Sequence, residues 1–173
     1  MESTSEPLVV SHPDPEIADV LIAAAATERL VSESLRRLGP TYLGKIPRGQ
    51  VWSAAETIGH LLDVEIAYGH HLRCILSQDT PRLSQFDEEK LATQGYWRTR
   101  DLPELLTAWS TLRRTHLVLI SRLDADMLAR GGILPDSGHP ITAREIALRF
   151  AIQDRFHLSQ LGVLEETLLR TPA

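Results

Sequence analysis

Four long segments with apolar residues at helical spacing constrain the fold of this chain most strongly, because each also carries a helix start signal. The start signals are Asp14–Pro15–Glu16, the capping box Ser53–Glu56, the pair Asp101–Glu104 and the capping box Thr142–Glu145. In a capping box the Ser or Thr side chain and the following Glu side chain satisfy each other's backbone N–H groups. Each amphipathic helix must bury its apolar stripe, so four of them predict an all-α four-helix bundle.

The connections between these segments predict little other structure. Residues 80–100 contain one short helical candidate, at Asp87–Ala92. Residues 124–141 are rich in glycine and contain a brief extended piece at Ile133–Leu134. No stretch alternates apolar and polar residues in the way that a half-buried strand does.

The composition excludes several classes of function. The chain has 173 residues, which is about one domain, and we expect a flexible N-terminal arm over 1–13 and a single domain over 14–173. A net charge of −5 argues against a nucleic-acid partner. No apolar run approaches the ~20 residues of a membrane span. The single cysteine, Cys74, suits the cytoplasm. We therefore expect a cytoplasmic protein that binds a small molecule, without a nucleic-acid or membrane partner.

Three polar residues interrupt the apolar face of the last helical segment. Gln153, His157 and Gln160 fall in the middle of the stripe that runs through Ile146–Leu169. A polar group placed there must find a partner or cost ~1–3 kcal/mol. Gln153 and His157 are four residues apart, which stacks their side chains on one face and is the spacing that lets a metal take two ligands from one helix. The pattern predicts a buried polar site.

Other helices add candidates to this site. His60 lies at the flank of the apolar stripe of the second segment, where its side chain could face a cleft. Arg113 and His116 lie on the apolar face of the third segment. They either line a pocket for an anionic or thiol-bearing ligand, or they are structural. In the structural interpretation Arg113 forms a buried ion pair with Glu65 or Asp63, and His116 is a hydrogen-bonded core residue.

The remaining features predict structural roles. Trp52 precedes a capping box and is expected to pack as a hydrophobic staple, while Cys74 is expected to pack in the second helix. The sequence contains no Gly-rich phosphate loop, no Gly-x-Ser-x-Gly elbow and no His-Glu-x-x-His motif. No local catalytic motif therefore identifies a reaction.

The order and spacing of several motifs resemble the DinB-like superfamily over roughly residues 15–170. The motifs that carry the resemblance are Trp52–Glu56 with Gly59–Glu65, then Phe86–Glu88 with Tyr96, then Pro140–Glu145 and Gln153–Gln160. The resemblance implies an up-down-down-up four-helix bundle that is often a homodimer. It also implies a site for zinc or nickel on residues matching His60, Gln153 and His157. Gln160 matches a polar residue that often follows the metal-binding histidine.

This chain departs from the family pattern at one ligand position. Position 153 is usually His, or Glu in one branch, and here it is Gln, whose amide oxygen is a weak ligand. The resemblance implies a divalent-metal-dependent enzyme, of thiol S-transferase or hydrolase type, that could use a low-molecular-weight thiol. Gln153 keeps open the alternative of a metal-free small-molecule-binding or stress-associated bundle. A dimerisation module with a purely structural role is a third interpretation.

Overall fold

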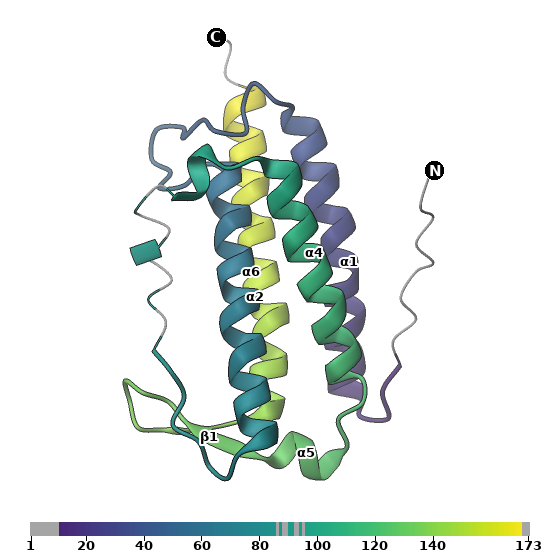
Figure 1. Cartoon of the computed structure of the whole chain (residues 1–173). Helices are drawn as coiled ribbons and strands as arrows, with labels where there is room; N and C mark the ends of the chain where they lie inside the picture. Colours follow the sequence, from purple (N-terminus) through teal and green to yellow (C-terminus); the bar gives the residue numbers. More distant parts are fainter. Residues whose placement is uncertain (1–10, 86, 88–89, 92–93, 95, 171–173) are drawn as a thin grey trace.

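Four long helices form an up-down-down-up bundle (Figure 1). The computed structural model describes residues 11–170 except 86, 88–89, 92–93 and 95. The long helices are α1 (Pro15–Leu38), α2 (Ala54–Ser77), α4 (Leu102–Ile120) and α6 (Ala143–Arg170). The short elements are the 3-10 helix η1 (Tyr96–Thr99), α5 (Ala125–Ala129), β1 (Gly131–Ile133) and β2 (Pro140–Thr142).

The helices begin where the local signals predict. The Asp14 carboxylate accepts hydrogen bonds from two backbone N–H groups of the first turn of α1. Ser53 and Glu56 form the predicted capping box of α2. Thr142 and Glu145 exchange the same pair of bonds at the start of α6. Only α4 differs, because Asp101 precedes the helix without a side-chain hydrogen bond to it.

The bundle core consists of two apolar clusters with polar residues where they meet. Helices α1 and α2 each pack against both α4 and α6. One cluster includes Leu72 and Phe150, and the other includes Ile58 and Leu161. The buried polar side chains at their junction, here called the polar layer, are Thr27, Glu65, Arg113, His116 and Asp154. The bundle therefore buries charge at mid-height, which requires close pairing.

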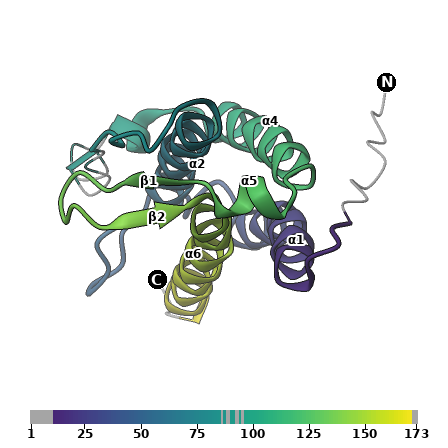
Figure 2. The ribbon, with the colours of Figure 1, turned by 90° about the horizontal axis from the view of Figure 1, so that it is seen from below.

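A short antiparallel hairpin closes one end of the bundle (Figure 2). β1 and β2 pair in the register Gly131↔Thr142, Gly132↔Ile141 and Ile133↔Pro140. Of the extended piece predicted at Ile133–Leu134, Ile133 is the last residue of β1 and Leu134 lies just beyond it; the partner strand β2 was not predicted. Gly132 is needed here, because a Cβ atom at this position would lie 2.9 Å from the Pro81 carbonyl oxygen.

Two predicted features fall partly outside the described residues. Of the short helix expected at Asp87–Ala92, Lys90 and Leu91 are helical, while residues 88–89 and 92 are not described. Of the expected N-terminal arm, residues 11–13 are described. There His12 Nε2 donates to the Leu123 carbonyl oxygen at 2.6 Å. Across the described part of the chain, no helix has the length and apolar character required to cross a membrane.

Candidate functional site

Two of the predicted site histidines meet between α2 and α6. His60 comes from the first half of α2 and His157 from the middle of α6, and they are 4% and 1% exposed. Their ring centroids lie 4.6 Å apart, with the edge of one ring against the face of the other. The packing of α2 against α6 therefore brings two imidazoles into direct contact inside the bundle.

Both ring nitrogens of His157 face side-chain amide oxygens. Nδ1 lies 2.7 Å from Gln160 Oε1, and Nε2 lies 3.1 Å from Gln153 Oε1. The Gln153 amide nitrogen donates to the Tyr68 hydroxyl at 3.2 Å. All three predicted polar residues of α6 thus belong to one connected group, and α2 contributes Tyr68 to it.

The protonation state of His157 limits how its two ring nitrogens can bind the two amide oxygens. Burial lowers the pKa of His157, and the hydrogen bond with Gln160 opposes the effect without cancelling it. The neutral ring carries one N–H and one lone pair, so it cannot donate to two amide oxygens. Two solutions remain: a cation lies between Nε2 and the Gln153 oxygen, or one amide is turned by 180° to present its NH₂ group to the ring.

His60 is also neutral at physiological pH. Burial lowers the pKa of His60 to about 4, and the proximity of His157 contributes to the shift. A metal ligand must offer the lone pair of a neutral imidazole. The protein therefore holds two histidines in the form that binds transition metals.

Trp52 covers both histidine rings. Its ring centroid is 4.6 Å from that of His60 and 6.0 Å from that of His157, nearly parallel to the latter at 21°. The sequence predicted only a packing role at the start of α2. No local pattern could reveal this contact, nor that of Tyr68 with Gln153, because both depend on how α2 and α6 pack.

Arg113 and His116 lie in the polar layer rather than beside the two site histidines. Arg113 donates to Glu65 through Nε at 2.7 Å and to both oxygens of Asp154 at 2.5 and 2.8 Å. His116 Nδ1 lies 2.6 Å from Glu65 Oε1. The structure thus contains the Arg113–Glu65 ion pair of the structural interpretation, and it adds Asp154, which the sequence did not suggest.

The hydrogen bonds of the polar layer define its charge state. Arg73 Nη1 lies 2.8 Å from His116 Nε2, and an arginine can only donate. His116 Nε2 is therefore the acceptor, and its Nδ1–H donates to Glu65. Burial acts to lower the pKa of Arg113, but the two carboxylates outweigh it and raise the pKa above its ordinary value. Every charged group of the layer has a partner, so the layer functions as a structural ion-pair network.

Asp63, the other acid considered for Arg113, has a different partner. Its carboxylate accepts a 2.7 Å hydrogen bond from Trp97 Nε1. The Trp97 ring lies on Gly59, where a Cβ atom would be 2.0 Å from its Cγ. Through these two contacts η1 packs against α2.

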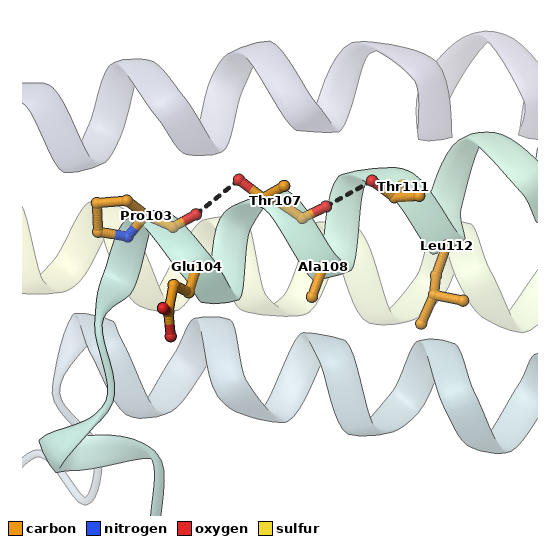
Figure 3. A pocket seen from close by; sticks show the side chains of 6 residues that line it. All are labelled: Pro103, Glu104, Thr107, Ala108, Thr111 and Leu112. Carbon is orange, nitrogen blue, oxygen red and sulfur yellow. Dashed lines mark hydrogen bonds between the residues drawn. The ribbon is translucent and has the colours of Figure 1, made fainter.

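A hollow formed by described residues lies on α4, away from the histidines. It encloses about 580 Å³ and is lined by Pro103, Glu104, Thr107, Ala108, Thr111 and Leu112 (Figure 3). Its two threonine hydroxyls donate to backbone carbonyl oxygens of α4. It contains none of the predicted site residues and offers few free polar groups, so we assign it no function.

Within the described part of the chain, no group of three or more His, Cys, Asp or Glu side chains is placed to hold a metal ion. Among the described residues, a third ligand for a metal at His60 and His157 would therefore be of another type, and Gln153 lies next to His157. Its neighbour Asp154 is bound to Arg113.

Comparison with known proteins assigns the family. The sequence model of the DinB superfamily matches residues 13–161, and the chain belongs to this superfamily. YfiT from Bacillus subtilis, described as a probable metal-dependent hydrolase with an unusual four-helix bundle topology, has a similar structure. The TM-score is 0.83 at 16% identity, covering 96% of this chain and 95% of YfiT. No curated protein matches the sequence. The predicted fold class is confirmed.

Proposed function

We propose that this protein is a divalent-metal-dependent enzyme, of hydrolase or thiol S-transferase type, with zinc or nickel held by His60, Gln153 and His157. One observation carries the proposal: His157 Nε2 lies 3.1 Å from the Gln153 amide oxygen, and Nδ1 lies 2.7 Å from the Gln160 amide oxygen, so a neutral ring turns a lone pair toward one of the two oxygens. A cation between Nε2 and Gln153 satisfies all of these atoms without turning an amide.

The donor set fits such an ion. Zinc and nickel accept imidazole nitrogen readily, and metal-bound histidines normally donate their other N–H to an oxygen. Gln160 supplies that oxygen for His157 at 2.7 Å. Gln153 is the weak ligand, so we expect a lower affinity than a site with three charged or imidazole ligands would have.

The residues around the ligands would shape the reaction. Trp52 and burial in the bundle keep water from the histidines, and Gln160 holds the proton on Nδ1 of His157. A bound metal would polarise a substrate or lower the pKa of a bound water or thiol. Cys74 lies near the end of α2 with its Sγ 3.5 Å from His70 Nε2, so a nucleophilic thiol would come from a low-molecular-weight compound in the cytoplasm.

Metal binding by untagged protein tests the proposal. We expect the protein to bind Zn²⁺ or Ni²⁺ with one-to-one stoichiometry in calorimetric titration, and His157→Ala to abolish binding. Gln153→His should tighten binding at least about tenfold, because it replaces a weak amide ligand with imidazole. Absence of binding in the unaltered protein, or equal affinity of Gln153→His, would contradict the proposal.

A metal-free small-molecule-binding or stress-associated bundle is the second candidate. The observation that favours it is the bond between the Gln153 amide and Tyr68. If the amide turns, its NH₂ donates to His157 Nε2 and its oxygen accepts from the Tyr68 hydroxyl, so the network closes without a metal. In that case zinc would leave the thermal unfolding temperature unchanged, and Tyr68→Phe would disturb the histidines. A screen of small anions and thiols by thermal shift would then seek the ligand.

A further inference from the structure

A groove between α2 and α4 carries two arginines that form no ion pair with any described carboxylate. The two helices pack side by side and run in the same direction (Figure 1). The groove encloses about 480 Å³, which lies within the roughly 300–1,000 Å³ of small-molecule sites. Its lining residues are Arg73, Leu76, Ser77, Thr115, Val118, Leu119 and Arg122. The groove therefore combines the size of a ligand site with a local excess of positive charge.

The body of the protein fixes Arg73 in position. Its Nη1 donates to the Gly69 carbonyl oxygen and to His116 Nε2, both at 2.8 Å. His116 is 2% exposed and is hydrogen-bonded to Glu65, so one edge of the guanidinium rests on the polar layer. Gly69 makes the contact possible, because a Cβ atom there would lie 2.1 Å from His116 Nε2. A ligand therefore meets a guanidinium that is already ordered, which lowers the entropic cost of binding.

The other edge of Arg73 has the geometry that binds a carboxylate. Arg37 holds both oxygens of Glu165 through its Nε and Nη2 atoms. In Arg73 the same two atoms form no hydrogen bond with the described residues, because its printed partners use Nη1 alone. A planar pair of N–H groups matches two oxygens of a carboxylate or phosphate. Arg73 therefore offers a bidentate anion site on its free edge.

The remaining polar groups of the groove leave recognition to the arginines. The Ser77 hydroxyl donates to the Arg73 carbonyl oxygen at 2.7 Å, and the Thr115 hydroxyl donates to the Thr111 carbonyl oxygen at 2.9 Å. Each hydroxyl has only one hydrogen, so neither can also donate to a ligand. A guanidinium can only donate, so Arg73 and Arg122 both require acceptors. The donors of the groove thus select anionic oxygen atoms.

The surface between the two arginines is apolar. Leu76 and Leu119 are half-buried and pack against the first apolar cluster of the core. Arg73 contacts His116, and Arg122 lies six residues further along α4, which is about 9 Å along the bundle. The groove thus has one cation toward each end and leucine side chains between them.

We propose that this groove binds a small organic anion with an apolar body, either a carboxylate or a phosphate monoester. The anionic group pairs with the free edge of Arg73, the apolar body covers Leu76 and Leu119, and Arg122 adds a second positive charge. Both arginines are exposed, so part of the ligand stays in water and we expect dissociation constants near the millimolar range. His60 precedes Arg73 by 13 residues on α2, or about 20 Å, so the inference does not depend on metal binding.

Titration of the full chain with hexanoate, followed by amide NMR shifts, tests the groove. We expect saturable shifts concentrated on residues 73–77 and 115–122. 1-Hexanol should bind at least about tenfold more weakly, because it lacks the charge that the arginines pair with. Hexyl phosphate in a parallel titration distinguishes the two head groups, and the tighter ligand identifies the class. Absence of saturable shifts in the groove, or equal affinity for 1-hexanol, would overturn the proposal.

A hexaglutamate peptide tests a different occupant, an acidic segment of another protein. It carries negative charge without an apolar body, so it should bind more weakly than hexanoate. Tighter binding of the peptide in the same groove would overturn the assignment to a small molecule.

A matched pair of substitutions at Thr115 locates the binding site. Thr115→Glu places a carboxylate in the groove that competes for the arginines, whereas Thr115→Gln has the same length without the charge. Thr115 is exposed on α4, so both proteins should fold, which circular dichroism verifies. Thr115→Glu should weaken hexanoate binding at least about tenfold relative to Thr115→Gln. Equal affinity of the two variants would overturn the proposal.

The second arginine is tested in the same way. Arg122→Gln should weaken hexanoate binding several-fold, because it removes one of the two positive charges. The control is Arg36→Gln, at an exposed position of α1 outside the groove, and it should bind as the unaltered protein does. Equal effects of the two substitutions would show that net charge, rather than the groove, attracts the anion, and would overturn the proposal.

Discussion

Asp63 offers the most quantitative test of how burial acts in this fold. The residue is 4% exposed, and among the described residues Trp97 donates a hydrogen bond to its carboxylate. Burial raises the pKa of Asp63 from 3.8 to about 6, even though the Trp97 hydrogen bond opposes the shift. Ionised Asp63 is therefore disfavoured in the folded protein relative to the unfolded chain.

The sign and size of the effect follow from linkage. A carboxyl whose pKa is raised by folding stabilises the fold below its unfolded pKa, and this contribution is lost as the pH rises through the folded value. Between pH 4 and pH 7 Asp63 should therefore cost stability. At 1.36 kcal/mol per pKa unit, a rise of about two units corresponds to ~3 kcal/mol. Asp63→Asn removes the titration and retains an oxygen that can accept from Trp97.

The assay is urea unfolding of both proteins between pH 4 and pH 8. The difference in the free energy of unfolding, Asp63→Asn minus the unaltered protein, should increase by ~3 kcal/mol between pH 4 and pH 8. Titration of His60 affects both proteins and cancels in this difference. Asp19→Asn, at an exposed position of α1, is the control and should show no such trend. A difference that is constant with pH would refute the reasoning.

Three further outcomes are expected from the buried contacts. Arg113→Met should destabilise the protein by ~3–5 kcal/mol in urea unfolding, because it leaves two buried carboxylates without their cation. Gly59→Ala should displace Trp97, whose Cγ lies 2.0 Å from the added Cβ, and shift tryptophan fluorescence to longer wavelength; an unchanged spectrum would contradict this packing. Tyr68→Phe should cost about 1 kcal/mol by removing the hydrogen bond with Gln153, and stability equal to the unaltered protein would count against that bond.

Local signals predicted the secondary structure well, for a physical reason. A capping box such as Ser53–Glu56 is made by residues three apart, so the sequence contains both partners and their spacing. The same holds for Gln153 and His157 on one helix face. Interactions of this range do not depend on the rest of the fold.

Contacts between helices were much harder to predict from the sequence. The sequence offered Glu65 and Asp63 as partners for Arg113, and packing selected Glu65 together with Asp154. Trp52 was assigned a packing role, yet its ring covers both site histidines. The β1–β2 pairing was also not anticipated, because each strand has only three residues and shows no alternation.

The spacing of apolar residues was sufficient to predict that four amphipathic helices would bury one face each, and that α6 would carry Gln153, His157 and Gln160 on its buried side. Which groups meet there depends on the packing of the helices. This packing brought His60 against His157 and committed Asp154 to Arg113, so that the side chain facing His157 Nε2 is the amide of Gln153. The reason is that helical spacing fixes the direction of a side chain relative to its own helix, whereas its partners depend on how the helices pack against each other.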